Sequence, residues 1–204
     1  MTTEQQVKEI KQSFRQMMDG SVSKSMRDKG VDYRLNWGAT LPRLRAKANE
    51  LGPNYDLAIA LWKENVRECK ILATMVMPPD IVLPEVIDIW MEQITSQEIA
   101  EQAAFNLFQH LPYSPMKAYT WMASDKPLYQ LCGFHILSRL FMNKQEPNER
   151  GINEFVDQAI VALQGDSLMV RKAAMSSIQR FSELGLVYER IAKSALKRAN
   201  LDFL

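Results

Sequence analysis

The sequence predicts an all-α protein whose helices form stacked pairs. Apolar residues recur at helical spacing through almost the whole chain, and no alternating run of apolar and polar residues reaches the length of a strand. Glycine is scarce, with eight residues, and several of the nine prolines lie where helices are expected to begin or end. Similar tracts of small and apolar residues also recur along the chain, as they do in helical-repeat proteins.

Length and composition predict one globular domain, residues 1–204, with a helical cap at residues 1–34 and the repeats at residues 35–204. Of the 204 residues, 47% are hydrophobic and 24% are charged, the ordinary balance of a folded protein. No N-terminal signal segment is recognisable, and no apolar run approaches the roughly 18 residues of a membrane helix. We therefore expect a cytoplasmic protein with no membrane partner.

The two cysteines and two histidines do not form the pattern of a metal site. Cys69 and Cys132 lie 63 positions apart without a CxxC motif, which argues against a zinc ribbon, a thioredoxin-type site and a disulfide scaffold. His110 and His135 are far in sequence from any paired cysteine or carboxylate. The sequence therefore predicts neither a metal nor a cofactor.

In the first half of the chain, apolar stripes and capping residues place the helices. A stripe over residues 7–18 predicts the first helix. Asn54 is expected to cap a later helix, because its side chain can accept a hydrogen bond from a free backbone N–H of the first turn. Pro84 suits the first turn of the next helix, where a backbone N–H is not needed.

From residue 95 onward the same signals continue. Thr95 with Glu98 three residues later has the pattern of a capping box, which predicts a helix over residues 99–108. Pro115 and Pro127 are expected to open the two helices that follow. The remaining apolar stripes predict helices at about 152–164, 168–183 and 185–199.

Repetition of four tracts sharpens the fold prediction. Three tracts, which begin at Val66, Leu128 and Met169, each follow a short polar turn, and a fourth begins at Gln97 between the first two. The steps of 31, 31 and 41 residues fit HEAT-like units, in which two helices form a pair and each pair packs on its neighbours. Small residues within the tracts, such as Gly133, allow close packing of helices. The sequence therefore predicts a curved α-α superhelix of HEAT-like helical repeats.

Charge is unevenly distributed along the chain, although the net charge is only +1. Residues 1–50 carry ten Lys or Arg against six Asp or Glu, and residues 166–204 carry seven against four. The middle, residues 51–165, carries eight against fourteen. Basic ends of this kind are typical of a surface that clamps a polyanion, but they are equally consistent with ordinary solvated helix faces.

One ordered set of short motifs resembles a known family. The stretch Leu-Asn-Trp-Gly-Ala-Thr-Leu-Pro-Arg-Leu-Arg over residues 35–45 is followed by Leu61-Trp62, then by Arg67-Glu68 and a Leu-Ala run. A later Trp-Met-Ala-Ser-Asp at residues 121–125 ends a helix in the same way. Together these motifs resemble the bacterial HEAT-repeat DNA alkylation repair proteins of the AlkD family, over about residues 14–198.

The resemblance implies a fold and a chemistry. Active members of that family are DNA glycosylases that excise positively charged N3- and N7-alkylated purines, and they hold the DNA backbone in a concave basic groove. An Asp carboxylate stabilises the oxocarbenium-like sugar, two tryptophans pack against the nucleotide, and an arginine helps to hold the backbone. A cationic base is a good leaving group, so a well-placed anion and close packing suffice.

Position by position, most of that site is replaced in this sequence. The family's Trp-Asp-x-x-Asp tract falls on residues 97–101, so Gln97 replaces the first tryptophan, Glu98 the first aspartate and Glu101 the catalytic aspartate. The arginine falls on Leu131 or its neighbour Gln130, neither of which can pair with a phosphate as an ion, and the second tryptophan falls on Ser176. The only candidate catalytic residue is therefore Glu101, and we expect base excision to be impaired or lost.

Five further residues are candidates for DNA contact. Trp37, which lies beside a glycine in a loop-like stretch, is suited to stacking on a base or sugar. Arg43 and Arg45 near one basic end, and Arg171 and Lys172 near the other, are suited to phosphate contact. The other tryptophans continue apolar helical stripes and are expected in the core: Trp62, Trp90 and Trp121.

Three functions remain open at this point. The first is a DNA-binding member of the alkylation-repair family with impaired or absent glycosylase activity, bound weakly to duplex DNA. The second is an active alkylpurine DNA glycosylase that uses Glu101. The third is a helical-repeat scaffold that binds a protein partner on its concave face.

Overall fold

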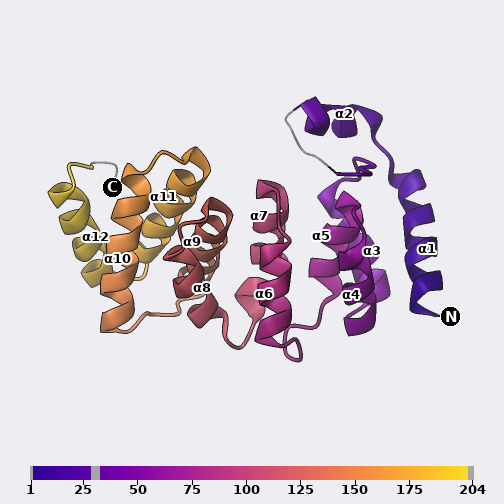
Figure 1. The fold of residues 1–204 in the computed structure, drawn as a ribbon. Helices are drawn as coiled ribbons and strands as arrows, with labels where there is room; N and C mark the ends of the chain where they lie inside the picture. Colours follow the sequence, from indigo (N-terminus) through magenta and orange to yellow (C-terminus); the bar gives the residue numbers. More distant parts are fainter. Residues whose placement is uncertain (1, 29–32, 202–204) are drawn as a thin grey trace. The chain divides into compact units, whose positions relative to one another are not determined.

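The computed structural model describes residues 2–28 and 33–201, which form helices throughout (Figure 1). These residues contain twelve α-helices, two short 3-10 helices and no β-strand. Their one isolated bridge pairs Leu35 with Val66. The chain divides into two compact units, Met1–Gln102 and Ala103–Leu204. The prediction of an all-α fold is confirmed.

The first unit begins with an N-terminal group of helices and continues with helix pairs. Its elements are α1 (Thr3–Ser13), η1 (Phe14–Met17), α2 (Gly20–Asp28), α3 (Leu41–Leu51), α4 (Tyr55–Lys63), α5 (Arg67–Val76), α6 (Pro84–Glu92) and the start of α7 (Gln97–Asn106). Packing contacts join α1 to α4, α3 to α5 and α4 to α5.

The second unit holds longer helices. Its elements after α7 are η2 (Phe108–His110), α8 (Ser114–Met122), α9 (Pro127–Met142), α10 (Glu149–Gln164), α11 (Leu168–Ser182) and α12 (Leu186–Arg198). Helix α9 packs against both α8 and α11, and α11 also packs against α10 and α12. Among the described residues, none of these helices is long and apolar enough to cross a lipid bilayer.

The predicted repeat spacing matches the second helix of each pair. Helices α5, α7, α9 and α11 begin at Arg67, Gln97, Pro127 and Leu168, each within one residue of a predicted tract start. The expected helix signals are present as well. The Asn54 side chain accepts a hydrogen bond from the Leu57 N–H at 3.0 Å, and Pro84 and Pro127 are the first residues of α6 and α9.

The capping box predicted at Thr95 and Glu98 is wrong. Helix α7 begins at Gln97, and the Ser96 hydroxyl accepts a hydrogen bond from the Ile99 N–H at 3.3 Å. Serine is a somewhat better helix cap than threonine, but Glu98 lies three residues after Thr95 and so imitates a capping box there. Glu98 is then in the first turn of α7. Its carboxylate accepts hydrogen bonds from Arg67, and not from the backbone N–H of Thr95 as the predicted capping box requires.

Aromatic rings fill the core of each unit. In the first unit, the Trp62 and Trp90 rings stack with centroids 4.2 Å apart, and the Trp62 indole N–H donates to the Gln93 amide oxygen at 2.8 Å. In the second unit, Phe108 packs edge-on against Trp121, and a cluster of phenylalanines links the longer helices. Trp62, Trp90 and Trp121 are all buried, which confirms their predicted role in the core.

The small residue Gly133 lets α8 and α9 approach closely. A Cβ atom at this position would lie 2.5 Å from the Met122 backbone nitrogen and 2.7 Å from the Ala118 carbonyl oxygen. Both atoms belong to backbone that is held within α8, so neither can move aside as a flexible side chain would. The predicted role of this glycine in close helix packing is confirmed.

Candidate functional site

Two of the residues that align with the family's catalytic tract contact each other on α7. The Gln97 amide nitrogen donates a hydrogen bond to Glu101 Oε1 at 2.8 Å. Gln97 is exposed and Glu101 is partly exposed, so both are accessible from solvent. Helical spacing places side chains four residues apart on the same face, which explains the contact. The carboxylate at the expected catalytic position is thus engaged by its neighbour.

The other two aligned positions lie in the second unit and have different environments. Leu131 in α9 is 1% exposed and forms part of the core, so its side chain does not reach a surface ligand. Ser176 is exposed on α11. Neither side chain carries a charge or an aromatic ring. The structure therefore brings Gln97 and Glu101 together, while positions 131 and 176 lack the cation and the aromatic ring that the resemblance implies.

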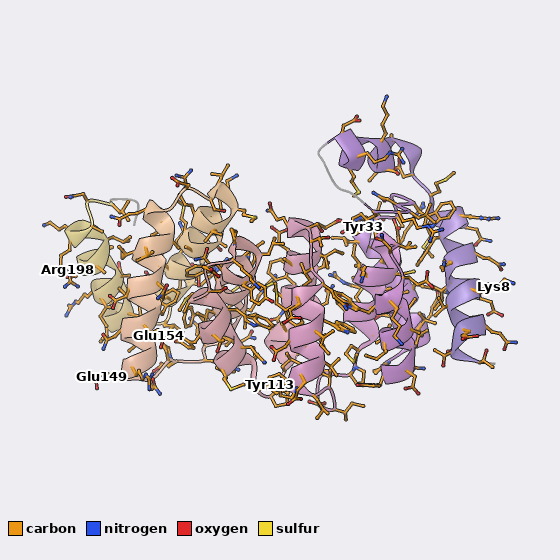
Figure 2. The ribbon with its side chains drawn as sticks, viewed as in Figure 1. Lys8, Tyr33, Tyr113, Glu149, Glu154 and Arg198 are labelled. Atoms are coloured by element: carbon orange, nitrogen blue, oxygen red, sulfur yellow. The ribbon has the colours of Figure 1, made fainter. Side chains whose placement is uncertain are left out.

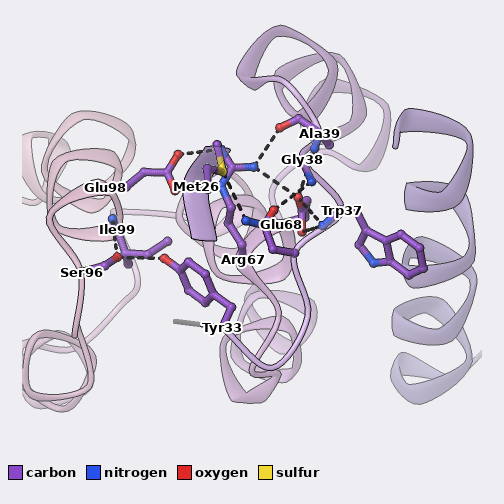
Figure 3. A network of polar contacts seen from close by, with 11 residues as sticks. Met26, Tyr33, Trp37, Gly38, Ala39, Arg67, Glu68, Ser96, Glu98 and Ile99 are labelled. Atoms are coloured by element: carbon purple, nitrogen blue, oxygen red, sulfur yellow. Dashed lines mark hydrogen bonds and ion pairs between the residues drawn. The ribbon is translucent and has the colours of Figure 1, made fainter. Parts of the chain in front are cut away.

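Glu98, the remaining aligned position, belongs to a buried ion network centred on Arg67 (Figure 3). Arg67 is 2% exposed, and its Nε and Nη2 donate to the two carboxylate oxygens of Glu98 at 2.8 and 2.6 Å. Its Nη1 donates to the Ala39 carbonyl at 2.9 Å and to Glu68 Oε1 at 3.2 Å. This guanidinium therefore connects α5, α7 and the segment before α3.

The charge state of Arg67 follows from these partners. Burial by itself lowers the pKa of the guanidinium, because it removes water from the charged form. Hydrogen bonding to Glu98 and the negative charges of Glu98 and Glu68 outweigh burial, so the pKa of Arg67 is raised above its ordinary value. A buried cation with two carboxylate partners is a structural element that holds neighbouring repeats together.

The network also fixes the backbone around Trp37. The buried Glu68 carboxylate accepts hydrogen bonds from the Trp37 N–H at 3.1 Å and the Ala39 N–H at 3.1 Å. On the other side, the Trp37 carbonyl accepts from the Asp19 N–H at 2.9 Å. Gly38 has a φ of 72°, and a Cβ there would lie 2.3 Å from the Asp19 carbonyl oxygen, so only glycine fits this close approach.

The Trp37 side chain projects from this fixed backbone, away from Arg67 (Figure 3). Its ring is partly exposed and lines a cavity of about 340 Å³ beside α1. The indole Nε1 atom is buried and has no hydrogen-bond partner among the described residues. The Trp37 ring therefore lines this cavity, and its buried indole N–H makes no hydrogen bond among the described residues. The other three tryptophans are core residues.

The predicted phosphate-binding cations are on the surface of their own units. Arg43 and Arg45 are exposed on α3 in the first unit. Lys172 is exposed and Arg171 is partly exposed near the start of α11 in the second unit. These four side chains are accessible to a polyanion. Arg171 and Lys172 lie close to the N-terminus of α11, which begins at Leu168.

Sequence reasoning missed two groups of residues. Arg67 and Glu68 were recognised as part of a motif, but nothing local indicated that their partners are 31 residues away. Lys8 on α1 and Arg15 on η1 were not singled out, and Lys8 extends outward from α1 (Figure 2). The two cations lie seven residues apart in sequence, on two consecutive helical elements.

Within the part of the chain that the structure describes, no three His, Cys, Asp or Glu side chains are grouped in a way that holds a metal ion. Cys69 and Cys132 are both buried and form no disulfide.

Comparison with known proteins was informative at the level of family and fold. The sequence matches the model of a family described as "DNA alkylation repair enzyme" over residues 10–183. A solved structure described as "A new family of proteins related to the HEAT-like repeat DNA glycosylases with affinity for branched DNA structures" is similar, with a TM-score of 0.83 at 14% identity. The likeness covers 94% of this chain and 82% of that one, which confirms the HEAT-like repeat fold. No curated protein matches the sequence.

Proposed function

Because the chain belongs to the DNA alkylation repair enzyme family, we propose that it binds DNA and that its base-excision activity is absent or strongly impaired. The observation that supports this most directly is the environment of the aligned site. Glu101 accepts a hydrogen bond from Gln97, and Leu131 is enclosed in the core where a phosphate-binding arginine is expected. A leucine there leaves the backbone phosphate without its cation.

The missing groups matter because excision depends on electrostatics and packing. As the glycosidic bond breaks, positive charge develops on the sugar, and a carboxylate must lie close to it. Removing one such element typically costs about 10²–10³ in rate, and displacement by about an ångström costs a further hundredfold or so. Glu101 is one methylene longer than aspartate and is held by Gln97, so its carboxylate is offset from the expected position.

Exposed cations support binding of the DNA backbone. Arg43 and Arg45 on α3, with Arg171 and Lys172 on α11, are accessible to phosphates. The similar solved protein is described as having affinity for branched DNA structures. We infer that this chain binds branched DNA in preference to a linear duplex.

A competition experiment tests this proposal. A fluorescent four-way junction is bound to the purified protein, and unlabelled junction or linear duplex of the same base composition is added over a series of salt concentrations. We expect the junction to compete more strongly than the duplex at every salt concentration, and both affinities to fall steeply with salt. Equal competition by the two DNAs contradicts the branched-DNA preference, and no binding of either contradicts DNA binding itself.

A further inference from the structure

The cavity beside Trp37 is built from three segments of the first unit. Helix α1 and the following η1 supply the greater part of the lining, and the segment before α3 and the C-terminal end of α4 supply the rest: Glu4, Val7, Lys8, Lys11, Gln12, Arg15, Leu35, Trp37 and Glu64. Its volume is about 340 Å³, near the lower end of the range of about 300–1,000 Å³ for small-molecule sites. A cavity of this size accommodates one nucleotide and is too small for a duplex.

The cations at this cavity are arranged for a negatively charged ligand. Lys11 is already paired, because its Nζ lies 2.7 Å from Glu64 Oε2. Lys8 and Arg15 are exposed and form no ion pair with any residue that the structure describes. The two unpaired cations lie on α1 and η1, so a phosphate can meet either without first breaking an internal pair.

A second cavity continues the same basic surface. It has a volume of about 490 Å³ and shares Lys11, Leu35 and Glu64 with the first. Its lining adds two exposed cations, Arg34 and Lys63. A chain of phosphates that leaves the first cavity through the shared residues therefore meets further positive charge.

Trp37 supplies an aromatic surface that is held in position before any ligand arrives. Its N–H and carbonyl are both bonded, to Glu68 and to Asp19, and the adjacent Gly38 fits against the Asp19 carbonyl. Little conformational entropy is lost when a base stacks on a ring whose backbone is already fixed. The indole Nε1 donor is buried and has no acceptor among the described residues, so the part of the ring that lines the cavity, and not this donor, is available to a base.

We propose that the cavity lined by Trp37, Lys8 and Arg15 binds a single unpaired nucleotide of a branched DNA, with the base against the Trp37 ring and the adjacent phosphates on Lys8 and Arg15. The proposal rests on the proposed DNA-binding function and specifies where the unpaired strand of a branch is held. A stacked base with cations along its backbone is the usual way in which proteins hold single-stranded nucleic acid. A free phosphate alone would leave the aromatic surface unused.

Two variants and a matched control test the proposal in the full chain. Trp37→Phe keeps an aromatic ring but removes the indole, and Lys8→Ala/Arg15→Ala removes the two unpaired cations. Lys24→Ala/Arg27→Ala removes the same charge from exposed positions on α2 in the same unit. Each protein is titrated with a blunt duplex and with the same duplex that carries a single-stranded thymidine arm, and circular dichroism checks that every variant is folded.

We expect the native protein to bind the armed duplex more tightly than the blunt one. Lys8→Ala/Arg15→Ala should lower affinity for the armed DNA by about five- to a hundredfold and leave blunt-duplex affinity nearly unchanged. The α2 control should keep the native ratio of the two affinities. The thymidine arm should also quench tryptophan fluorescence in the native protein and not in Trp37→Phe.

The outcomes separate this inference from the proposed function. If the native protein binds neither DNA, the proposed function fails. If it binds DNA but the ratio of armed to blunt affinity is unchanged in Lys8→Ala/Arg15→Ala, and the quenching persists in Trp37→Phe, the cavity is not the nucleotide site. Equal losses of affinity for the armed DNA in Lys24→Ala/Arg27→Ala and in Lys8→Ala/Arg15→Ala also overturn the inference, because they indicate only a general effect of charge.

Discussion

Arg67 and Glu98, which are 31 residues apart, are joined by two charge-assisted hydrogen bonds at 2.8 and 2.6 Å. The same separation recurs in two other contacts of the first unit, between the Trp37 N–H and Glu68 and between the Trp62 indole and Gln93. It equals the first two steps of the predicted repeat. Equivalent positions of consecutive repeats therefore meet directly, and in this unit polar bonds tie one repeat to the next.

Loss of the Glu98 carboxylate should destabilise the first unit. Removing one partner of a buried ion pair typically costs 3–5 kcal/mol. The Glu98 side chain is 25% exposed and Glu68 continues to balance the charge of Arg67, so we expect Glu98→Ala to lower the free energy of unfolding by about 2 kcal/mol. Urea denaturation followed by tryptophan fluorescence measures the change.

A surface carboxylate provides the control for that measurement. Glu92→Ala removes an exposed carboxylate at the end of α6 and should change the free energy of unfolding by less than about 0.5 kcal/mol. If Glu98→Ala proves as mild as Glu92→Ala, the Arg67 network does not stabilise the fold.

Gly133→Ala should destabilise the second unit, although alanine is normally the better helix former by about 1 kcal/mol. The added Cβ would lie 2.5 Å from the Met122 nitrogen, so α8 and α9 must separate. We expect a loss of about 2–3 kcal/mol, as for other overpacked cores. Gly20→Ala, where a Cβ meets nothing within 4 Å, is the control in the first turn of α2. A Gly133→Ala protein that melts at or above the native temperature contradicts the close contact.

His135 should make stability depend on pH. Burial lowers the pKa of this imidazole to about 4, and the nearby positive charge of Arg139 adds to the effect. Because the unfolded histidine titrates near 6.5, the unfolded chain binds an extra proton between about pH 6.5 and 4, and stability falls as pH falls through that range. The contribution of His135 is about 3 kcal/mol lost by pH 4.

A difference measurement isolates this histidine from the carboxylates that titrate below it. The free energy of unfolding of His135→Gln minus that of the native protein should rise as pH decreases from 6.5 to 4. A flat difference for His135→Gln would mean that the buried ring accepts a proton without cost.

Much of the fold was predictable because its signals are local. Asparagine and proline placed the starts of α4, α6 and α9, and the repeated small-residue tracts placed the starts of α5, α7, α9 and α11 to within one residue. The sequence favours Thr95 instead of Ser96 as the cap because Glu98, three residues after Thr95, completes the capping-box pattern. The Glu98 carboxylate instead binds the guanidinium of Arg67, one repeat earlier, and no local sequence pattern indicates such a contact.

The surroundings of the candidate site were less predictable for the same reason. A loop position for Trp37 followed from its neighbouring glycine, and a core position for Trp62 followed from its apolar stripe. The cavity beside Trp37 arises from contact between α1 and a segment some twenty residues later, so it depends on tertiary packing. The sequence shows that Lys8 and Arg15 are seven residues apart, but not that both lie beside an aromatic ring.

The salt dependence of DNA binding should identify the cations of the second unit that meet phosphates. Each lost phosphate contact lowers the slope of log K against log salt by about 0.9 for duplex DNA. Arg171→Ala/Lys172→Ala should therefore reduce the slope by about 2. Arg150→Ala/Arg190→Ala removes two exposed cations from the same unit and should leave the slope unchanged. An unaltered slope in Arg171→Ala/Lys172→Ala removes that pair from the interface.

Base release under conditions where the DNA is demonstrably bound tests the central claim most directly. Purified protein in excess is incubated with duplex DNA that carries N7-methylguanine or N3-methyladenine, and bound DNA and freed base are measured in the same samples over time. Because positions 97, 131 and 176 lack the ring and the cation of the family site, we predict bound DNA and release no faster than spontaneous loss without protein. Robust release by the native protein that disappears in Glu101→Gln would contradict this account and establish Glu101 as the catalytic carboxylate.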